Sequence, residues 1–126
     1  MNFLNEFQGK SGSLQLEDRQ LVEPLVDEYK KIDFEKLPHA FVHGDLIATN
    51  VMRGRDGKMW VIDFAVANFY PRIQEIAVLA CNMLLDERSK EGSAANLELA
   101  LKEYQIKIML TPEELKTLPS YIKLAH

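Results

Sequence analysis

The chain has 126 residues, 47% of them hydrophobic and 27% charged, which is a composition typical of globular proteins and enough for one domain at most. Its net charge of -4 excludes nucleic acid as the main partner, because binding to a phosphate backbone needs a surplus of Lys and Arg. Apolar stretches end well short of the roughly 20 residues of a membrane span, so we expect no membrane partner. The single cysteine, Cys81, favours a cytoplasmic protein, and its apolar neighbours predict a buried, inert thiol.

The first half of the chain is predicted as one helix followed by short strands. Apolar residues recur at helical spacing over residues 14–32, after a polar Gly- and Ser-containing segment, and Pro24 is expected to kink this helix or to begin a new one. Apolar runs then predict strands at residues 40–43, 51–53 and 59–62. The Asp56-Gly57 pair predicts a tight hairpin between the last two strands, with Trp60 in its core.

The second half is predicted as helical. Apolar spacing indicates a helix from Ile73 to Leu84, with Pro71 in its first turn, where a missing N–H is harmless. A second helix is expected from Ser93, as its cap, to about Lys107. A third begins at residues 111–114, where a Thr and a Glu three residues later form a capping box. The fold class is therefore α+β and mostly helical.

Three polar side chains stand at the ends of the predicted strands. Phosphoryl transfer requires an acceptor for the hydroxyl proton and ligands for Mg²⁺, held close together. Asp45 follows a strand and precedes a loop, where a carboxylate can point into an open cleft. Asn50 offers an amide oxygen, which is a suitable hard ligand for Mg²⁺. Asp63 ends the hairpin, which folds it back beside Asn50, so the pattern predicts a phosphotransferase.

The spacing is that of a kinase catalytic loop, with His43-Gly44-Asp45-Leu46 and Asn50-Val51-Met52 followed by Val61-Ile62-Asp63-Phe64. These blocks resemble the aminoglycoside phosphotransferase superfamily, which includes choline kinases and type II homoserine kinases. The resemblance runs from about Leu37 to the C-terminus, and the pattern of the last helices is similar to the homoserine kinase branch. Gly44 replaces the Arg with which protein kinases hold a phosphorylated activation loop, so the resemblance favours small-molecule kinases.

This resemblance implies the C-terminal lobe of a protein-kinase-like fold, with a small β-hairpin at the catalytic loop. It also implies an ATP-dependent phosphotransferase that acts on the hydroxyl of a small molecule of the homoserine, aminoglycoside, choline or sugar type. Asp45 is implied as the catalytic base or hydroxyl-orienting group, Asn50 and Asp63 as Mg²⁺ ligands, and His43 as a structural brace of the loop. Glu75 stands where relatives usually carry an Asp.

The nucleotide-binding parts of such a kinase are not recognisable, because no Gly-rich loop or strand Lys precedes the catalytic loop. We therefore expect residues 1–126 to be a partial C-terminal lobe that lacks the nucleotide lobe, has truncated C-terminal helices and is inactive alone. Uncovered helix faces at Leu97, Leu101, Tyr104 and Ile108 are then expected to favour a homodimer. The alternative is a noncatalytic kinase-like module that binds a protein partner through apolar surface.

The remaining polar residues are expected to be structural. Arg72 is interpreted as an anchor for the loop beyond Asp63 in preference to a phosphate ligand. His39 and His126 have no carboxylate or Cys partners at metal-ligand spacing, so they are expected at the surface.

Overall fold

The structure is a computed structural model that describes residues 16–125. The chain divides into two compact units, residues 1–33 and 34–126, which are described separately. The predictions for residues 1–15, including the start of the first helix, and for His126 lie outside the described residues. No helix within the described range is both long enough and apolar enough to cross a membrane.

The first unit contributes the helix α2 (Leu16–Lys30), which confirms the predicted helix. The helix continues through Pro24 without a break, so of the two predicted effects of this residue, a kink or a new start, the new start is not found. A proline removes one N–H and crowds the preceding turn, but helical residues on both sides keep the segment continuous. Lys30 in the last turn suits the negative end of the helix dipole.

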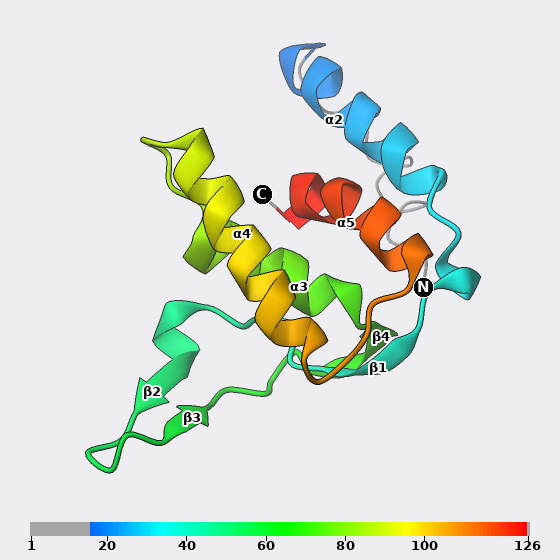
Figure 1. Cartoon of the computed structure of the whole chain (residues 1–126). Helices are drawn as coiled ribbons and strands as arrows, with labels where there is room; N and C mark the ends of the chain where they lie inside the picture. Colours follow the sequence, from blue (N-terminus) through cyan, green and yellow to red (C-terminus); the bar gives the residue numbers. More distant parts are fainter. Residues whose placement is uncertain (1–15, 126) are drawn as a thin grey trace. The chain divides into compact units, whose positions relative to one another are not determined.

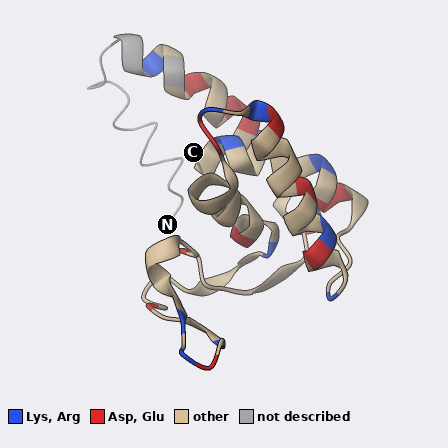
Figure 2. Cartoon of the chain, turned by 60° about the vertical axis from the view of Figure 1, so that its left-hand side comes forward, with Lys and Arg blue, Asp and Glu red and all other residues tan. Residues whose placement is uncertain are grey.

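The second unit begins with the 3-10 turn η2 (Phe34–Lys36) and a two-stranded antiparallel sheet of β1 (His39–Val42) and β4 (Asn68–Pro71), visible in Figure 1. The register pairs His39 with Pro71 and Val42 with Asn68. The sequence did not predict β4, and Pro71 is the last residue of this strand, not part of a helix. A strand end tolerates proline because no ladder bond is needed there. Figure 2 shows no charged residue on this sheet.

The predicted hairpin is confirmed by β2 (Val51–Arg53) and β3 (Met59–Val61), which pair antiparallel. Its loop carries the charged residues at the tip of the hairpin in Figure 2. Gly57 has φ +79°, which L side chains rarely adopt, so the turn needs a glycine here. Trp60 is 57% exposed, so the expectation that it lies in a hairpin core is wrong for this chain. The sheet has only these two strands, and neither face of it is covered well enough to bury the indole.

The core of the second unit lies between α3 (Ile73–Leu79) and α5 (Pro112–Ala125), which contact each other. The helix predicted from Ile73 is confirmed, but its last part is a π-helix, η4 (Ala80–Leu84), closed by a bond from Leu85 N to Ala80 O (3.0 Å). The side chains buried between these elements include Ile73, Ile76, Ala77, Leu118 and Tyr121.

The helix α4 (Lys90–Gln105) begins earlier than predicted. Ser89 is its cap, because Ser89 has extended backbone and its Oγ accepts a bond from Gly92 N (2.9 Å). Ser93, the predicted cap, lies inside the helix, where its Oγ accepts a bond from Asp86 N (2.8 Å). Ser89 and Ser93 lie about one helical turn apart, and a serine at either position could cap the helix. The backbone conformation before Lys90 makes Ser89 the cap.

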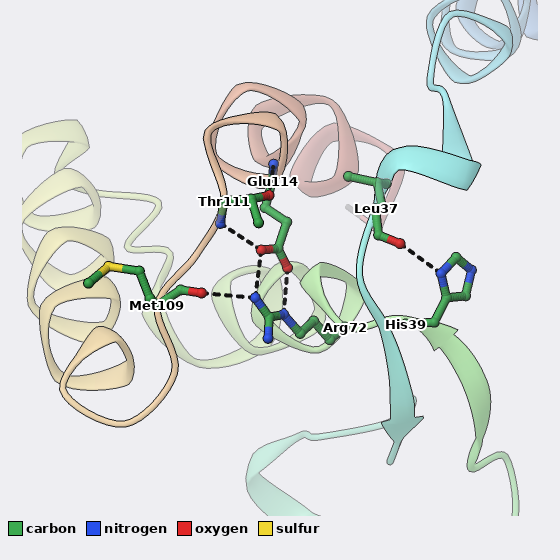
Figure 3. A network of polar contacts seen from close by, with 6 residues as sticks. All are labelled: Leu37, His39, Arg72, Met109, Thr111 and Glu114. Carbon is green, nitrogen blue, oxygen red and sulfur yellow. Dashed lines mark hydrogen bonds and ion pairs between the residues drawn. The ribbon is translucent and has the colours of Figure 1, made fainter.

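The start of α5 confirms the predicted capping box. Thr111 N donates to Glu114 Oε2 (2.8 Å), and Glu114 N donates to Thr111 Oγ1 (3.2 Å). Glu114 is fully buried and also forms an ion pair with Arg72, whose Nε lies 2.7 Å from Oε1. Figure 3 shows the guanidinium held between this carboxylate and the carbonyl of Met109. Arg72 is therefore structural, but it anchors α5 and not the loop beyond Asp63.

The electrostatics of this pair follow from burial and hydrogen bonding. Burial alone raises the pKa of Glu114, but bonds from Arg72 and Thr111 outweigh it, and the net pKa lies below the ordinary 4.5. The hydrogen bond to Glu114 likewise raises the pKa of Arg72. Burial raises the pKa of the Cys81 thiol, which donates to Ile122 O (3.2 Å). The cysteine is only half-buried, so the prediction of a buried thiol is met in part.

Candidate functional site

The site is a loop of residues 43–50 that leaves the end of β1 and ends in the 3-10 turn η3 (Ala48–Asn50). Gly44 opens the loop with φ +82°. A Cβ at this position would stand 3.1 Å from the carbonyl oxygen of Val66, so both the backbone angle and the close approach require glycine. Sequence reasoning had noted Gly44 only for the arginine that it replaces.

Asp45 and Asn50 are joined across this loop. Asn50 Nδ2 donates to the Asp45 backbone oxygen (2.9 Å) and to its carboxylate oxygen Oδ2 (3.0 Å). Both partners are acceptors, which fixes the amide nitrogen on this side and turns Oδ1 of Asn50 to the other. The loop thus holds a carboxylate in place, while the amide oxygen, a type of atom that can bind Mg²⁺, is not used in these bonds.

Asp63 lies at the open end of the hairpin beside Asn50. Beyond the last ladder pair, Ile62 N donates to Asn50 O (3.0 Å), which extends the pairing to the residue before Asp63. Asp63 has φ 63°. Among the described residues it is the one non-glycine residue with a positive φ. The residue is exposed, and among residues 16–125 its carboxylate accepts one long bond, from Ala65 N (3.4 Å). An acidic side chain held in an uncommon backbone conformation with few partners is typical of a functional residue.

The ring of His43 connects the backbone at Asp45 with the backbone at Ile62. Its Nδ1 accepts a bond from Asp45 N (3.2 Å), so the neutral ring carries its proton on Nε2, which lies 2.8 Å from the carbonyl oxygen of Ile62. The ring is buried and meets the Phe64 ring edge-on at 4.5 Å. One imidazole therefore ties the residue before Asp63 to the backbone of Asp45.

Glu75, on α3, was missed as a site residue, because the sequence showed it only as a substitute for Asp. Its Oε2 accepts bonds from His43 N (2.6 Å) and Gly44 N (3.3 Å), so it clamps the start of the loop. Its Oε1 is buried and has no hydrogen-bond partner among the described residues. The signal in the sequence was an acid between the apolar positions Ile73 and Ile76, on a helix whose other residues are apolar except Gln74.

The structure therefore brings His43, Asp45, Asn50 and Asp63 to one end of the hairpin. Within residues 16–125 no group of three or more His, Cys, Asp or Glu side chains is placed to hold a metal. The oxygen donors that are present, one carboxylate and one amide at the end of a hairpin, fit Mg²⁺, which takes few protein ligands and completes its shell with water and phosphate. Such a set can hold a metal only together with its phosphate ligand.

A loop that sets one carboxylate against an amide, with a second carboxylate at the end of a hairpin, is the arrangement expected of kinase-like phosphotransferases. The model of the phosphotransferase enzyme family, abbreviated APH, matches residues 4–107, and the chain belongs to this family. The mostly helical α+β fold with two small antiparallel sheets agrees with the kinase-like fold of that family. A search of curated proteins finds no match to the chain.

Proposed function

We propose that this chain is the catalytic-loop part of an ATP- and Mg²⁺-dependent kinase that phosphorylates the hydroxyl of a small molecule of the homoserine, aminoglycoside, choline or sugar type. The observation that carries the proposal is the pair of bonds from Asn50 Nδ2 to Asp45, next to the exposed carboxylate of Asp63. In this arrangement Asn50 holds one carboxylate oxygen of Asp45, and its own amide oxygen takes no part in these two bonds.

Asp45 is proposed to orient the acceptor hydroxyl and to accept its proton. Asn50 binds Oδ2 of Asp45, so this carboxylate has a fixed direction and can bind a hydroxyl through its other oxygen. The bond between Asp45 N and His43 fixes the backbone behind it. The carboxylate is partly exposed, which leaves a path for a small substrate.

Asn50 and Asp63 are proposed as the Mg²⁺ ligands. When bound, the metal supplies positive charge that bridges and neutralises the phosphate oxygens. The chain's own contribution is to hold the two ligands at one end of the hairpin through the bond from Ile62 N to Asn50 O. His43 supports both sides of the site, because it contacts Asp45 N and Ile62 O.

The proposal is tested first by metal binding to the chain itself. Mn²⁺ added with ATP should broaden the NMR amide signals of residues 45–50 and 62–64, because the metal is paramagnetic and takes the ligands of Mg²⁺. Asp63→Ala and Asn50→Ala should remove this effect, whereas Asp45→Asn should retain it. Broadening that survives Asp63→Ala, or that appears elsewhere, contradicts the metal assignment.

The second test is turnover. Residues 1–126 contain no recognisable Gly-rich loop or strand Lys, so we expect no transfer from this chain by itself. In a polypeptide that joins it to a nucleotide-binding lobe, Asp45→Asn should keep Mg-ATP affinity and lower kcat by about 10²–10⁴-fold, for loss of base and orientation. Asp63→Ala should lose both Mg-ATP affinity and turnover, and Asn50→Ala should show intermediate losses of affinity and kcat. Equal loss of ATP affinity in the Asp45 and Asp63 variants contradicts the two roles.

A noncatalytic module that binds a protein partner is the second candidate. Large apolar side chains of the hairpin are exposed, among them Met52, Met59 and Trp60. Such a cluster is common at protein interfaces. The Mn²⁺ experiment discriminates between the two functions, because a module without phosphate chemistry has no reason to bind the metal at Asn50 and Asp63.

A further inference from the structure

Among the described α-helices of the second unit, α4 is the one without a buried residue. None of its residues is buried, although it contains three leucines. Apolar residues at its C-terminal end are widely exposed, with Ile106 at 65% and Met109 at 76%. A shallow groove follows this helix, lined by Leu97, Leu101, Ile106 and Met109 and by the charged pair Glu98 and Lys102.

We infer that this surface binds a second copy of the same chain, with the two α4 helices antiparallel. The surface, called the α4 face below, consists of Ala94, Leu97, Glu98, Leu101, Lys102 and Ile106. In a two-fold contact the same surface is used by both copies, so a pairing of one residue with another occurs twice. The α4 face must therefore be complementary to itself, and its charges show that it is.

Glu98 and Lys102 are one helical turn apart on this face and have opposite charges. A two-fold axis at the level of Ala100 places Glu98 of each copy opposite Lys102 of the other. A parallel arrangement would instead place Glu98 opposite Glu98 and Lys102 opposite Lys102, and both contacts are repulsive. The charges thus select the antiparallel arrangement.

The apolar residues fit the same axis. It places Ala94 of one copy opposite Ile106 of the other, a small side chain against a large one at both ends of the contact. Of the apolar residues of the face, Leu101 and Leu97 lie nearest to the axis and form the apolar centre. A contact made by one helix from each copy is smaller than a standard interface, so the dimer is weak and reversible. This inference does not depend on the proposed function.

Sedimentation equilibrium of the chain from about 10 µM to about 1 mM tests the self-association directly. The native chain is expected to pass from monomer to dimer over this range. Leu101→Asp, which puts a charge near the axis, should abolish the dimer. Leu99→Asp is the matched control, because Leu99 is exposed on the same helix but does not line the groove. A native chain that stays monomeric, or loss of the dimer in the Leu99 variant alone, overturns the proposal.

A charge exchange tests the antiparallel register. Glu98→Lys and Lys102→Glu each place like charges opposite each other twice, and each should raise the dimer dissociation constant about tenfold at low salt. Mixing the two single variants restores opposite charges at both contacts, so the mixture should form a heterodimer. Circular dichroism checks that both variants keep the native helix content. If each variant dimerises as the native chain does, or the mixture stays monomeric, the register is wrong.

Discussion

Glu114 and Asp63 show that this chain holds acidic side chains in two opposite ways. Glu114 is fully buried and accepts bonds from Arg72 and from Thr111, so its carboxylate has well-placed partners at both oxygens. Asp63 is exposed, has an uncommon backbone angle and accepts one long bond from Ala65 N. The first arrangement stabilises the fold, whereas the second keeps a charge available at some cost in backbone strain.

The largest loss of stability is expected when the buried side chain of Glu114 is truncated. Glu114→Ala leaves Arg72 without its ion-pair partner and removes half of the capping box, so the free energy of unfolding should fall by about 3–5 kcal/mol. Urea denaturation followed by circular dichroism measures it. Glu113→Ala is the matched control, because Glu113 neighbours Glu114 and forms only a surface pair with Lys116 at 3.6 Å. A similar loss in both variants would contradict the structural role of the buried pair.

The loop of residues 43–50 contributes to stability through the backbone conformation of Gly44. Gly44→Ala should cost about 1–3 kcal/mol, since it combines a strained φ with a Cβ placed 3.1 Å from Val66 O. Gly57→Ala separates the two causes, because Gly57 has a similar φ of +79° but open space around it. Chemical denaturation of both variants should show a larger loss for Gly44. Equal losses would mean that the contact with Val66 has no effect.

Acid should weaken the buried pair. Because the folded pKa of Glu114 is lowered from its ordinary 4.5, the carboxylate stabilises the fold fully above that value, and this contribution is lost as the pH falls through the folded pKa. Unfolding free energies measured between about pH 6 and pH 3 should therefore fall less steeply in Glu114→Gln than in the native chain. If the unfolding free energy of the two proteins has the same slope against pH, the carboxylate of Glu114 does not contribute to the acid sensitivity of the fold.

The smallest effect is expected at the exposed acid. Asp63→Asn keeps the size of the side chain and suits the left-handed backbone angle, so the free energy of unfolding should change by no more than about 0.5 kcal/mol. The same variant should lose the Mn²⁺ broadening at residues 62–64. A loss of stability comparable to that of Glu114→Ala would show that Asp63 is structural and would remove the contrast between the two regions.

Local sequence patterns predicted the elements that depend on neighbouring residues. The hairpin turn at Gly57, the capping box of Thr111 and Glu114, and the helical spacing from Ile73 all rely on contacts within a few positions. The same holds for the loop, in which Asp45 and Asn50 are separated by only five positions and are joined directly. These patterns are visible because the interacting residues are close in the sequence.

What the sequence did not reveal depends on distant contacts. The strand β4 is short, ends in Pro71 and is defined only by its pairing with β1, far back in the chain. Arg72 meets Glu114 across 42 positions, and Glu75 meets His43 across 32. No periodicity links such pairs, so neither the partner of Arg72 nor the clamp on the loop could be derived from local composition.

The bonds that place the two carboxylates involve main-chain atoms to a large extent. The carbonyl and amide of Ile62, the amides of Asp45 and His43 and the carbonyl of Asn50 all take part. A substitution at Ile62 changes a side chain but leaves these groups in the backbone. Mutations in the strands and loop can therefore accumulate and reshape the surroundings of the site without displacing its charges. In evolutionary terms, this framework tolerates sequence drift in the residues around its charges.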